Sequence, residues 1–299
     1  MVIKPTIIVH GGASNLPDEL VTPYYDGVLS AVKMGADALK SGESALDAVE
    51  TAVRYMEDNA TFNAGRGSHP ADNGIIEQDA IIMDGRTLNM GACAVVPNIR
   101  HAITLARHIM EHSSHCFLAG EGALEYAREA GLEIVDNEWL IVEEKIERYR
   151  RLMAMENAHD NNKGTGDTVG AVAIDKDGNL ASATSTGGTF GKIAGRVGDS
   201  ALPGCGATAE NGVCAVSTTG WGESIMRVRM AEYAAFAIIR GMSPQEACEK
   251  AIERLSVIER GRGGLILLSH NGDYAWAFNT TRMARAIIID DKKPTVMVD

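Results

Sequence analysis

One stretch, residues 163–175, constrains this chain more than any other. A polar, Gly-rich segment ends at Asp167, and Thr168 then leads into VGAVAI, a run of small and β-branched residues that is typical of a buried strand. A polar loop tolerates an internal chain break, and a strand directly after it would hold the new terminus rigidly. The sequence therefore predicts cleavage between Asp167 and Thr168, into segments 1–167 and 168–299.

A threonine at such a new terminus carries both groups that a hydrolase needs. Its hydroxyl is a poor nucleophile near neutral pH and requires a base within about 3 Å. A free α-amine has an unperturbed pKa of about 7.7 to 8.0, so a useful fraction is neutral, whereas an internal Thr has only an amide nitrogen. Cleavage would create the catalyst, and Thr168 is the predicted nucleophile. From this stretch alone, a strand-edge hydroxyl without a catalytic role stays open.

Further motifs rich in Gly, Ser and Thr lie on both sides of this stretch. They are HGG at 10–12, FNAG at 62–65, STGG at 185–188, GRVGDS at 195–200, STTG at 217–220 and GES at 222–224. In this order they resemble the plant-type L-asparaginase and isoaspartyl aminopeptidase family of N-terminal nucleophile hydrolases. The resemblance covers nearly the whole chain, with residues 137–166 the least recognisable part. It implies hydrolysis of the side-chain amide of L-asparagine and of the isopeptide bond of β-aspartyl dipeptides.

The resemblance also implies a role for each catalytic residue. Thr168 would attack the carbonyl carbon and form a β-aspartyl ester, which water then hydrolyses. Thr186 would hydrogen-bond Thr168 and orient it. The Thr219 hydroxyl and the Gly220 backbone N–H would form the oxyanion hole. A buried hydroxyl bonded to the backbone is the alternative interpretation of Thr186.

Substrate binding is implied for four residues. The planar guanidinium of Arg196 suits an α-carboxylate, and the carboxylate of Asp199 suits an α-ammonium. Without the flanking glycines, a cation and an anion three residues apart would more often be a solvated ion pair. Gly222 would add a backbone contact, and Asn63 would support the site from the first half of the chain.

A sodium ion and no organic cofactor are implied as well. A hard monovalent ion held by backbone carbonyls leaves almost no side-chain pattern, so this expectation rests on the resemblance. The carbonyl ligands would be those of Met56, Glu57, Asn59, Phe62, Ala64 and Arg66.

Composition excludes several classes of function. The 299 residues are 45% hydrophobic and 23% charged, which is enough for a buried core in a folded protein. A net charge of −12 without basic runs argues against nucleic acid as a partner. Five Cys without short paired spacings favour reduced thiols, and no signal sequence or apolar run of about 18 residues is present. We expect a cytoplasmic protein with a small-molecule substrate, and the resemblance implies a dimer of processed heterodimers.

Periodicity predicts alternating groups of strands and helices. Strands are expected at 2–9, 74–83, 88–96, 168–175, 180–185, 213–218, 264–269, 274–278 and 284–289, with HGG as a turn after the first. Helices are expected at 20–40, 44–58, 101–112, 120–130, 138–156, 223–240 and 243–256. Neither half has enough strands to cover its own sheet faces, so residues 1–299 form one domain. The expected fold class is α+β, a four-layer αββα sandwich of the N-terminal nucleophile hydrolase type.

Three departures from the family pattern leave the leaving group open. Asp167 stands where the family usually has Gly, and an Asp-Thr bond is similar to that of the related glycosylasparaginases. Ala13 replaces a third Gly after HGG, and Trp221 occupies a position where a smaller or polar residue is usual. A glycosylasparaginase-like activity is therefore an alternative, although the STTG motif and the absence of a targeting segment favour the asparaginase branch.

Two alternatives come from other classes. His108, Glu111 and His112 match the H-x-x-E-H signature of zinc peptidases, with two His one helical turn apart. Their helix carries an apolar core stripe that leaves all three on its opposite face, and no third ligand is identifiable. The other alternative is a small-molecule binding protein with an intact chain and no turnover.

Overall fold

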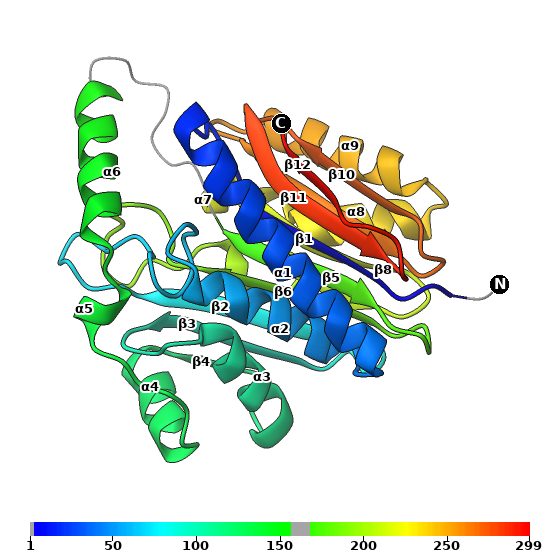
Figure 1. Cartoon of the computed structure of the whole chain (residues 1–299), viewed down its shortest axis with the longest axis horizontal. Helices are drawn as coiled ribbons and strands as arrows, with labels where there is room; N and C mark the ends of the chain where they lie inside the picture. Colours follow the sequence, from blue (N-terminus) through cyan, green and yellow to red (C-terminus); the bar gives the residue numbers. More distant parts are fainter. Residues whose placement is uncertain (1–2, 157–167) are drawn as a thin grey trace.

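The structure, a computed structural model, describes residues 3–156 and 168–299 (Figure 1). Thr168 is described, whereas Asp167 and the predicted scissile bond lie outside the described residues.

Two stacked sheets form the centre of the described chain. The larger has eight strands, β12-β11-β1-β5-β6-β2-β3-β4, and the smaller has four, β10-β9-β8-β7. Neighbouring strands are antiparallel except for the parallel pair β3–β4. The bounds are β1 Thr6–Ser14, β2 Gln78–Asp84, β3 Met90–Val96, β4 Phe117–Ala119, β5 Val169–Ile174, β6 Leu180–Thr186, β7 Ala207–Glu210, β8 Cys214–Gly220, β9 Gly263–Ser269, β10 Tyr274–Phe278, β11 Arg282–Ile289 and β12 Thr295–Val298.

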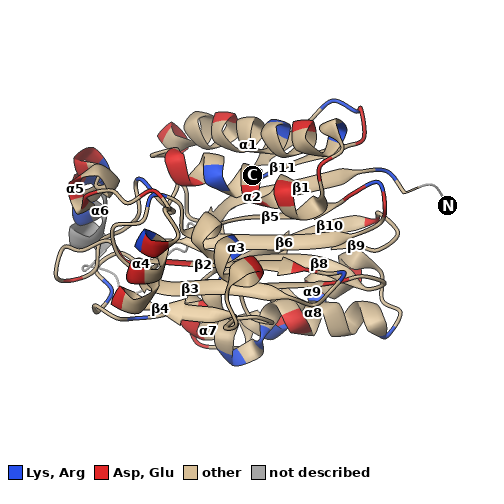
Figure 2. Cartoon of the chain, turned by 90° about the horizontal axis from the view of Figure 1, so that it is seen from below, with Lys and Arg blue, Asp and Glu red and all other residues tan. Residues whose placement is uncertain are grey.

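Helices cover the outer face of each sheet. Figures 1 and 2 show α1 and α2 on one side and α8 and α9 on the other. The bounds are α1 Val21–Ser41, α2 Ala45–Asp58, α3 Ala102–His112, α4 Gly120–Glu129, α5 Asn137–Leu140, α6 Glu143–Glu156, α7 Gly222–Val228, α8 Met230–Ile239 and α9 Pro244–Ser256, with short 3-10 turns at Asp18–Leu20 and Asp199–Ala201. The predicted four-layer αββα sandwich is confirmed.

Three apolar clusters separate these layers. Along β1, Ile7 and Val9 face the cluster under α1 and α2, while Ile8 faces the cluster between the two sheets. This alternation follows from the two-residue period of a strand, and it makes β1 apolar on both faces. The third cluster, which includes Val216 and Leu265, lies between the smaller sheet and α8 and α9. Burial on both sides makes the central strands rigid supports for the residues at their ends.

Helix starts follow local sequence signals. Ser44 and Asp47 form a reciprocal capping box at the start of α2, as do Ser243 and Glu246 at the start of α9. Each box satisfies backbone N–H groups that lack intrahelical partners, which explains why the predicted starts of these two helices agree with the structure within one residue.

Some expected elements are wrong. The HGG motif is not a turn after the first strand but lies inside β1, where the register to β11 shifts between His10 and Ala13 and Gly12 has φ 112°. The expected helix 138–156 is divided into α5 and α6. The expected helix 223–240 is divided at Arg229, which has φ 52°.

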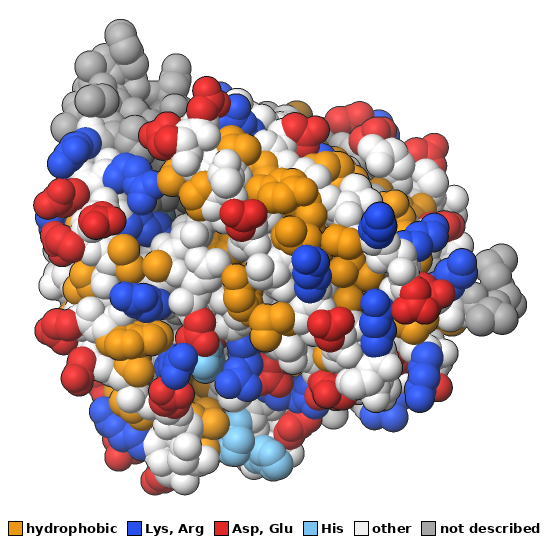
Figure 3. Space-filling model, in the orientation of Figure 1, with side chains coloured by type: hydrophobic (Ala, Val, Ile, Leu, Met, Phe, Trp, Pro, Cys, Tyr) orange, Lys and Arg blue, Asp and Glu red, His pale blue; other side chains and the backbone are white. Residues whose placement is uncertain are grey.

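Charge and exposure also follow the layers. Lys, Arg, Asp and Glu lie mainly on the outer helices and loops, and on the face in Figure 3 both signs are interspersed. All five cysteines lie in the described ranges and are free, and Cys116 is the exposed one. None of the described helices has the length and apolar character that crossing a membrane requires.

Candidate active site

Thr168 lies directly before β5, beside the end of β6. The two strands pair through Val169 and Ser185, so Thr168 and Thr186 come together at one end of the ladder. Thr168 Oγ1 donates to Thr186 Oγ1 across 3.1 Å, and the Gly188 N–H donates to the same oxygen across 3.0 Å. Both threonines are almost fully buried. Thr186 therefore holds the Thr168 hydroxyl in a defined orientation.

His10 of the HGG motif lies behind this pair. It is opposite Gly170 in the β1–β5 ladder, and its Nε2 lies 2.8 Å from Ser217 Oγ in the other sheet. Burial lowers the pKa of His10 to about 3, although a hydrogen bond with the Thr168 backbone partly opposes this shift. A Cβ on Gly170 would lie 2.0 Å from Ser217 Oγ and 2.5 Å from His10 Nε2. Glycine there lets a neutral histidine link the two sheets next to the nucleophile.

Thr219 and Gly220 are the last two residues of β8, and they lie at the same end of the stacked sheets as Thr168. Ser217 faces Gly170, whereas Asn211, before β8, contacts Leu180 at the far end of β6. The C-terminal end of β8 in the smaller sheet therefore lies against the N-terminal end of β5 in the larger sheet. Thr219 is fully buried. Gly220 has φ 145°, and a Cβ there would lie 2.4 Å from the Arg262 carbonyl oxygen, so this position requires glycine.

Arg196, Asp199 and Gly222 form a compact group near the start of α7. A Cβ on Gly222 would lie 2.7 Å from Arg196 Nη2 and 3.0 Å from Asp199 Oδ1, so glycine lets the two charged groups approach the backbone. Arg196 Nε and Nη2 donate to the two carboxylate oxygens of Glu223, each across 2.9 Å. Thr218 Oγ1 donates to Asp199 Oδ2 across 3.1 Å. The geometry suits a ligand with adjacent carboxylate and ammonium groups.

Burial changes the electrostatics of this group. It raises the pKa of the Asp199 carboxyl to about 6, against the opposing influence of the Arg196 guanidinium and the Thr218 hydrogen bond. For Glu223, burial opposes ionisation, but the hydrogen bonds and charge of Arg196 lower its pKa overall. Arg196 and Glu223 are thus stable in their charged forms, while Asp199 changes protonation in a mildly acidic range.

Asn63 reaches the site from the loop after α2. Its Nδ2 donates to the Gly188 carbonyl across 2.6 Å, and its Oδ1 accepts from the His69 N–H across 2.8 Å. The Gly187 N–H donates to the Asn63 carbonyl across 2.9 Å. Asn63 therefore holds the segment that follows Thr186.

Comparison with known proteins identifies the family of the chain. The Asparaginase_2 family model, described as Asparaginase, matches residues 3–298. The chain belongs to this family. It is 45% identical over 97% of its length to an isoaspartyl peptidase/L-asparaginase of Xenopus laevis, covering 94% of that protein. Proteins with the same name in Danio rerio and Homo sapiens are 42% and 41% identical, over 94% and 97% of this chain and 91% and 95% of theirs.

Three of the backbone carbonyls expected to hold a sodium ion already accept hydrogen bonds. The Glu57 carbonyl accepts from the Arg66 N–H across 2.7 Å, and the Asn59 carbonyl accepts from the Phe62 N–H across 3.1 Å. The Phe62 carbonyl accepts from the Lys145 ammonium. Neutral carbonyl oxygens with a free lone pair suit a hard cation, but the charge of the Lys145 ammonium opposes a second cation at the Phe62 carbonyl, so the carbonyls of Glu57 and Asn59 fit such an ion better than that of Phe62.

The helix with the H-x-x-E-H pattern has other contacts. His108 Nδ1 lies 3.1 Å from the Tyr126 hydroxyl, and Glu111 pairs with Arg107 on the same helix. Within residues 3–156 and 168–299, no group of three or more His, Cys, Asp and Glu side chains is arranged to hold a metal ion. The zinc-peptidase interpretation receives no support from the structure.

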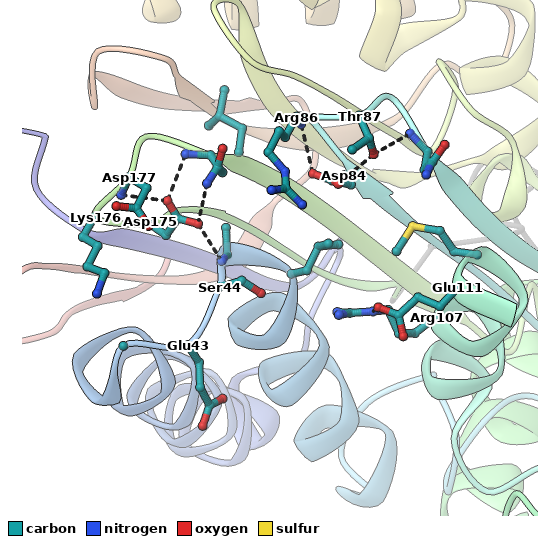
Figure 4. Close-up of a pocket in the computed structure, with 17 residues that line it drawn as sticks. Glu43, Ser44, Asp84, Arg86, Thr87, Arg107, Glu111, Asp175, Lys176 and Asp177 are labelled. Atoms are coloured by element: carbon teal, nitrogen blue, oxygen red, sulfur yellow. Dashed lines mark hydrogen bonds and ion pairs between the residues drawn. The ribbon is translucent and has the colours of Figure 1, made fainter.

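A polar cavity of about 500 Å³ lies at the opposite end of β5 (Figure 4). Its lining includes Asp84, Arg86 and Asp175 but none of the predicted catalytic residues. The Asp175 carboxylate accepts from the N–H groups of Asp177 and Asn179 across 3.0 and 2.9 Å, which stabilises the β5–β6 turn. These contacts account for Asp175 as a turn-forming residue.

Several polar residues of the site had no role assigned from the sequence. Glu223 pairs with Arg196, and Thr218 binds Asp199. Buried Asp79 accepts from the Gly198 N–H across 3.3 Å, and burial raises its pKa. Two features of the sequence could have indicated these roles: Asp79 is an acid within the apolar run of β2, and Glu223 is an acid directly after Gly222.

Trp221, one of the departures, lies at the N-terminus of α7. The backbone N–H of Trp221 donates to the Arg262 carbonyl across 2.9 Å, and the Arg260 guanidinium lies 5.8 Å from the centroid of the indole ring. Ala13, another departure, is buried between the two sheets.

Proposed function

We propose that this protein is an amidohydrolase that converts L-asparagine to L-aspartate and ammonia and cleaves the isopeptide bond of β-aspartyl dipeptides. The names of relatives that cover nearly its whole length support this activity. The structural observation that carries it is the Thr168–Thr186 hydrogen bond at the start of β5. It orients a hydroxyl at the residue that cleavage would turn into a chain terminus.

The first chemical step uses the α-amine that cleavage before Thr168 would release. This amine takes the proton from Thr168 Oγ1 as the oxygen attacks the side-chain carbonyl carbon of the substrate. The Thr219 hydroxyl and the Gly220 N–H stabilise the charge that develops on the carbonyl oxygen. The C–N bond then breaks, the amine or ammonia leaves with the proton, and a β-aspartyl ester to Thr168 remains.

Water completes the reaction. A water molecule attacks the ester carbonyl carbon and gives a proton to the α-amine. The C–O bond to Thr168 then breaks, Thr168 Oγ1 takes this proton from the α-amine, and aspartate leaves. Throughout, Arg196 holds the α-carboxylate, and ionised Asp199 holds the α-ammonium with a backbone contact at Gly222. A buried clamp fixes the carbonyl carbon near Thr168, which converts part of the binding energy into orientation.

Cleavage between Asp167 and Thr168 is part of the proposal, with chains 1–167 and 168–299 remaining together. Strand β5, from the second chain, pairs with β1 and β6, so the break would leave the sheet intact. We also propose a dimer of these heterodimers, a sodium ion on the carbonyls after α2, no organic cofactor and a cytoplasmic location. Five free thiols are in keeping with a reducing compartment.

Intact mass spectrometry over several days at neutral pH, followed by turnover assays, tests the proposed function. The expected result is loss of the 31.8 kDa species, a second chain that begins at Thr168, and release of ammonia from L-asparagine. A persistent intact chain with no turnover would support a binding protein instead. Preferential cleavage of an N-glycosylated asparagine would favour the glycosylasparaginase alternative.

A further inference from the structure

Lys145, in the first turn of α6, is a buried lysine that contacts backbone. Its side chain Nζ donates to the carbonyl oxygens of Thr61 across 3.3 Å, Phe62 across 2.5 Å and Gly67 across 2.6 Å. The residue is only 4% exposed. A buried ammonium is costly unless its hydrogen bonds are satisfied, so these contacts must hold the carbonyls firmly in place.

The carbonyls bound by Lys145 flank one short segment, residues 63–66. They lie directly before and directly after it, so one ammonium closes the loop that carries Asn63. Two further contacts join the same loop to α5: the Gly67 N–H donates to the Leu140 carbonyl across 2.8 Å, and Arg66 Nε donates to the Trp139 carbonyl across 3.3 Å. The segment that contains α5 and α6 thus sets the conformation of this loop.

From this loop, a continuous series of hydrogen bonds leads to the nucleophile. Asn63 Nδ2 donates to the Gly188 carbonyl, and the Gly188 N–H donates to Thr186 Oγ1. Thr186 Oγ1 in turn accepts from Thr168. Asn63 and Gly188 are both buried, which leaves little freedom for the intermediate groups.

We propose that Lys145 is a positioning residue for the hydrolysis: its ammonium fixes the loop of Asn63 and thereby the orientation of Thr186 toward Thr168. This inference rests on the proposed function. It assigns to α6, the last of the described helices before the predicted cleavage site, a role in the finished site.

Loss of the Lys145 ammonium should affect kcat and KM differently. The series from Lys145 reaches the groups that orient the nucleophile. The clamp depends on other contacts, Arg196 with Glu223 and Asp199 with Thr218. Loss of the ammonium should therefore slow the chemical step and leave binding of the substrate's α-carboxylate and α-ammonium nearly unchanged.

The test compares Lys145→Met, Lys145→Arg and Arg151→Met. Met keeps the length and apolar stem of lysine but cannot donate, and Arg restores donors and charge. Arg151→Met is the matched control, because it removes a cation from the same helix at an exposed surface pair with Glu147. Kinetics with L-asparagine are measured on fully cleaved protein, quantified by intact mass. Hydrogen exchange is followed at residues 61–69 and 186–189.

We expect Lys145→Met to lower kcat by about 10-fold or more with KM within about 2-fold, since small misplacements of reacting groups are costly. Faster exchange at residues 186–189, partial recovery of kcat in Lys145→Arg and unchanged behaviour in Arg151→Met complete the expected result. A lower melting temperature with wild-type kcat and wild-type exchange at residues 186–189 would overturn the proposal.

Two further controls keep the result interpretable. If Lys145→Met does not fold, Lys145→Gln, which retains an N–H donor without the charge, is measured in the same way. If wild-type protein shows no turnover, the proposed function fails, and hydrogen exchange still decides whether Lys145 controls the segment after Thr186.

Discussion

Arg196 and Glu223 form a two-point ion pair, with Nε and Nη2 each 2.9 Å from one carboxylate oxygen. The guanidinium is 15% exposed, so its orientation toward a carboxylate already exists before substrate binds. Because Glu223 takes the Nε–Nη2 edge, a substrate carboxylate would meet the remaining Nη1 and Nη2 hydrogens of a guanidinium that is already held in place, which reduces the ordering that binding must supply.

Arg196→Lys should raise KM for L-asparagine by about 30- to 100-fold with a smaller effect on kcat. Lysine keeps the charge but lacks the planar pair of donors, and hydrogen bonds to charged groups contribute about 1.5–3 kcal/mol. Steady-state kinetics measure the effect, and Arg282→Lys, in the exposed pair with Asp18, is the matched control. An unchanged KM would contradict the proposed clamp.

Thr168→Ala should leave a folded, uncleaved and inactive chain, because it removes the hydroxyl and leaves the fold of β5 intact. Thr168→Ser retains the hydroxyl and should cleave and turn over at a reduced rate, since the methyl group that restricts its rotamer is lost. Intact mass and ammonia release measure both. Appreciable asparaginase activity in the Ala variant would refute the assignment of the nucleophile.

Thr219→Val should lower kcat by about 10²- to 10³-fold with little change in KM, because it removes one donor of the proposed oxyanion hole. The adjacent Thr218→Val is an informative comparison. Thr218 binds Asp199 in the clamp, so its loss should mainly raise KM. If both variants affected the same kinetic constant, the division of roles along β8 would be wrong.

kcat/KM should fall as pH decreases through about 6. Burial raises the pKa of Asp199 to about 6 in the folded protein, so below that pH the carboxyl is neutral and no longer pairs with the substrate ammonium. His10, with a pKa lowered to about 3, is neutral throughout this range and does not contribute. The α-amine of Thr168, with an unperturbed pKa of about 7.7 to 8.0, adds a limb at higher pH that Asp199→Asn should keep, whereas the residual activity of this variant should lack the limb near 6. A limb at the same pH in that variant would assign it to another group.

Gly65→Ala should destabilise the protein by about 3 kcal/mol or more. Gly65 has φ 54°, and a Cβ there would lie 2.2 Å from the Glu57 carbonyl oxygen, so strain and overpacking add. Gly74→Ala is the matched control, since it has φ 82° but no atom within 4 Å of the added Cβ. We expect about 1 kcal/mol there, which is the cost of the left-handed backbone conformation alone. Denaturant unfolding measures both, and equal losses would contradict the steric argument.

Residue patterns determined the layers of this fold. The apolar runs of β1, β5 and β9 predict buried strands, and the helix starts expected at 44 and 243 agree with α2 and α9, where the structure has capping boxes. The short strands β4, β7 and β12, of three or four residues, were not predicted, because strands of that length form only by pairing with a neighbour.

The ordered Gly, Ser and Thr motifs also placed Thr168, Thr186, Arg196 and Asp199 in one proposed site. Only the tertiary structure decided what surrounds them: the HGG motif inside a bulged strand, Glu223 on Arg196, and the ammonium of Lys145 on carbonyls 78 to 84 residues away. Local sequence encodes periodicity, caps and turns through neighbouring atoms. Burial, pKa shifts and long-range hydrogen bonds arise only when distant segments pack together and exclude water.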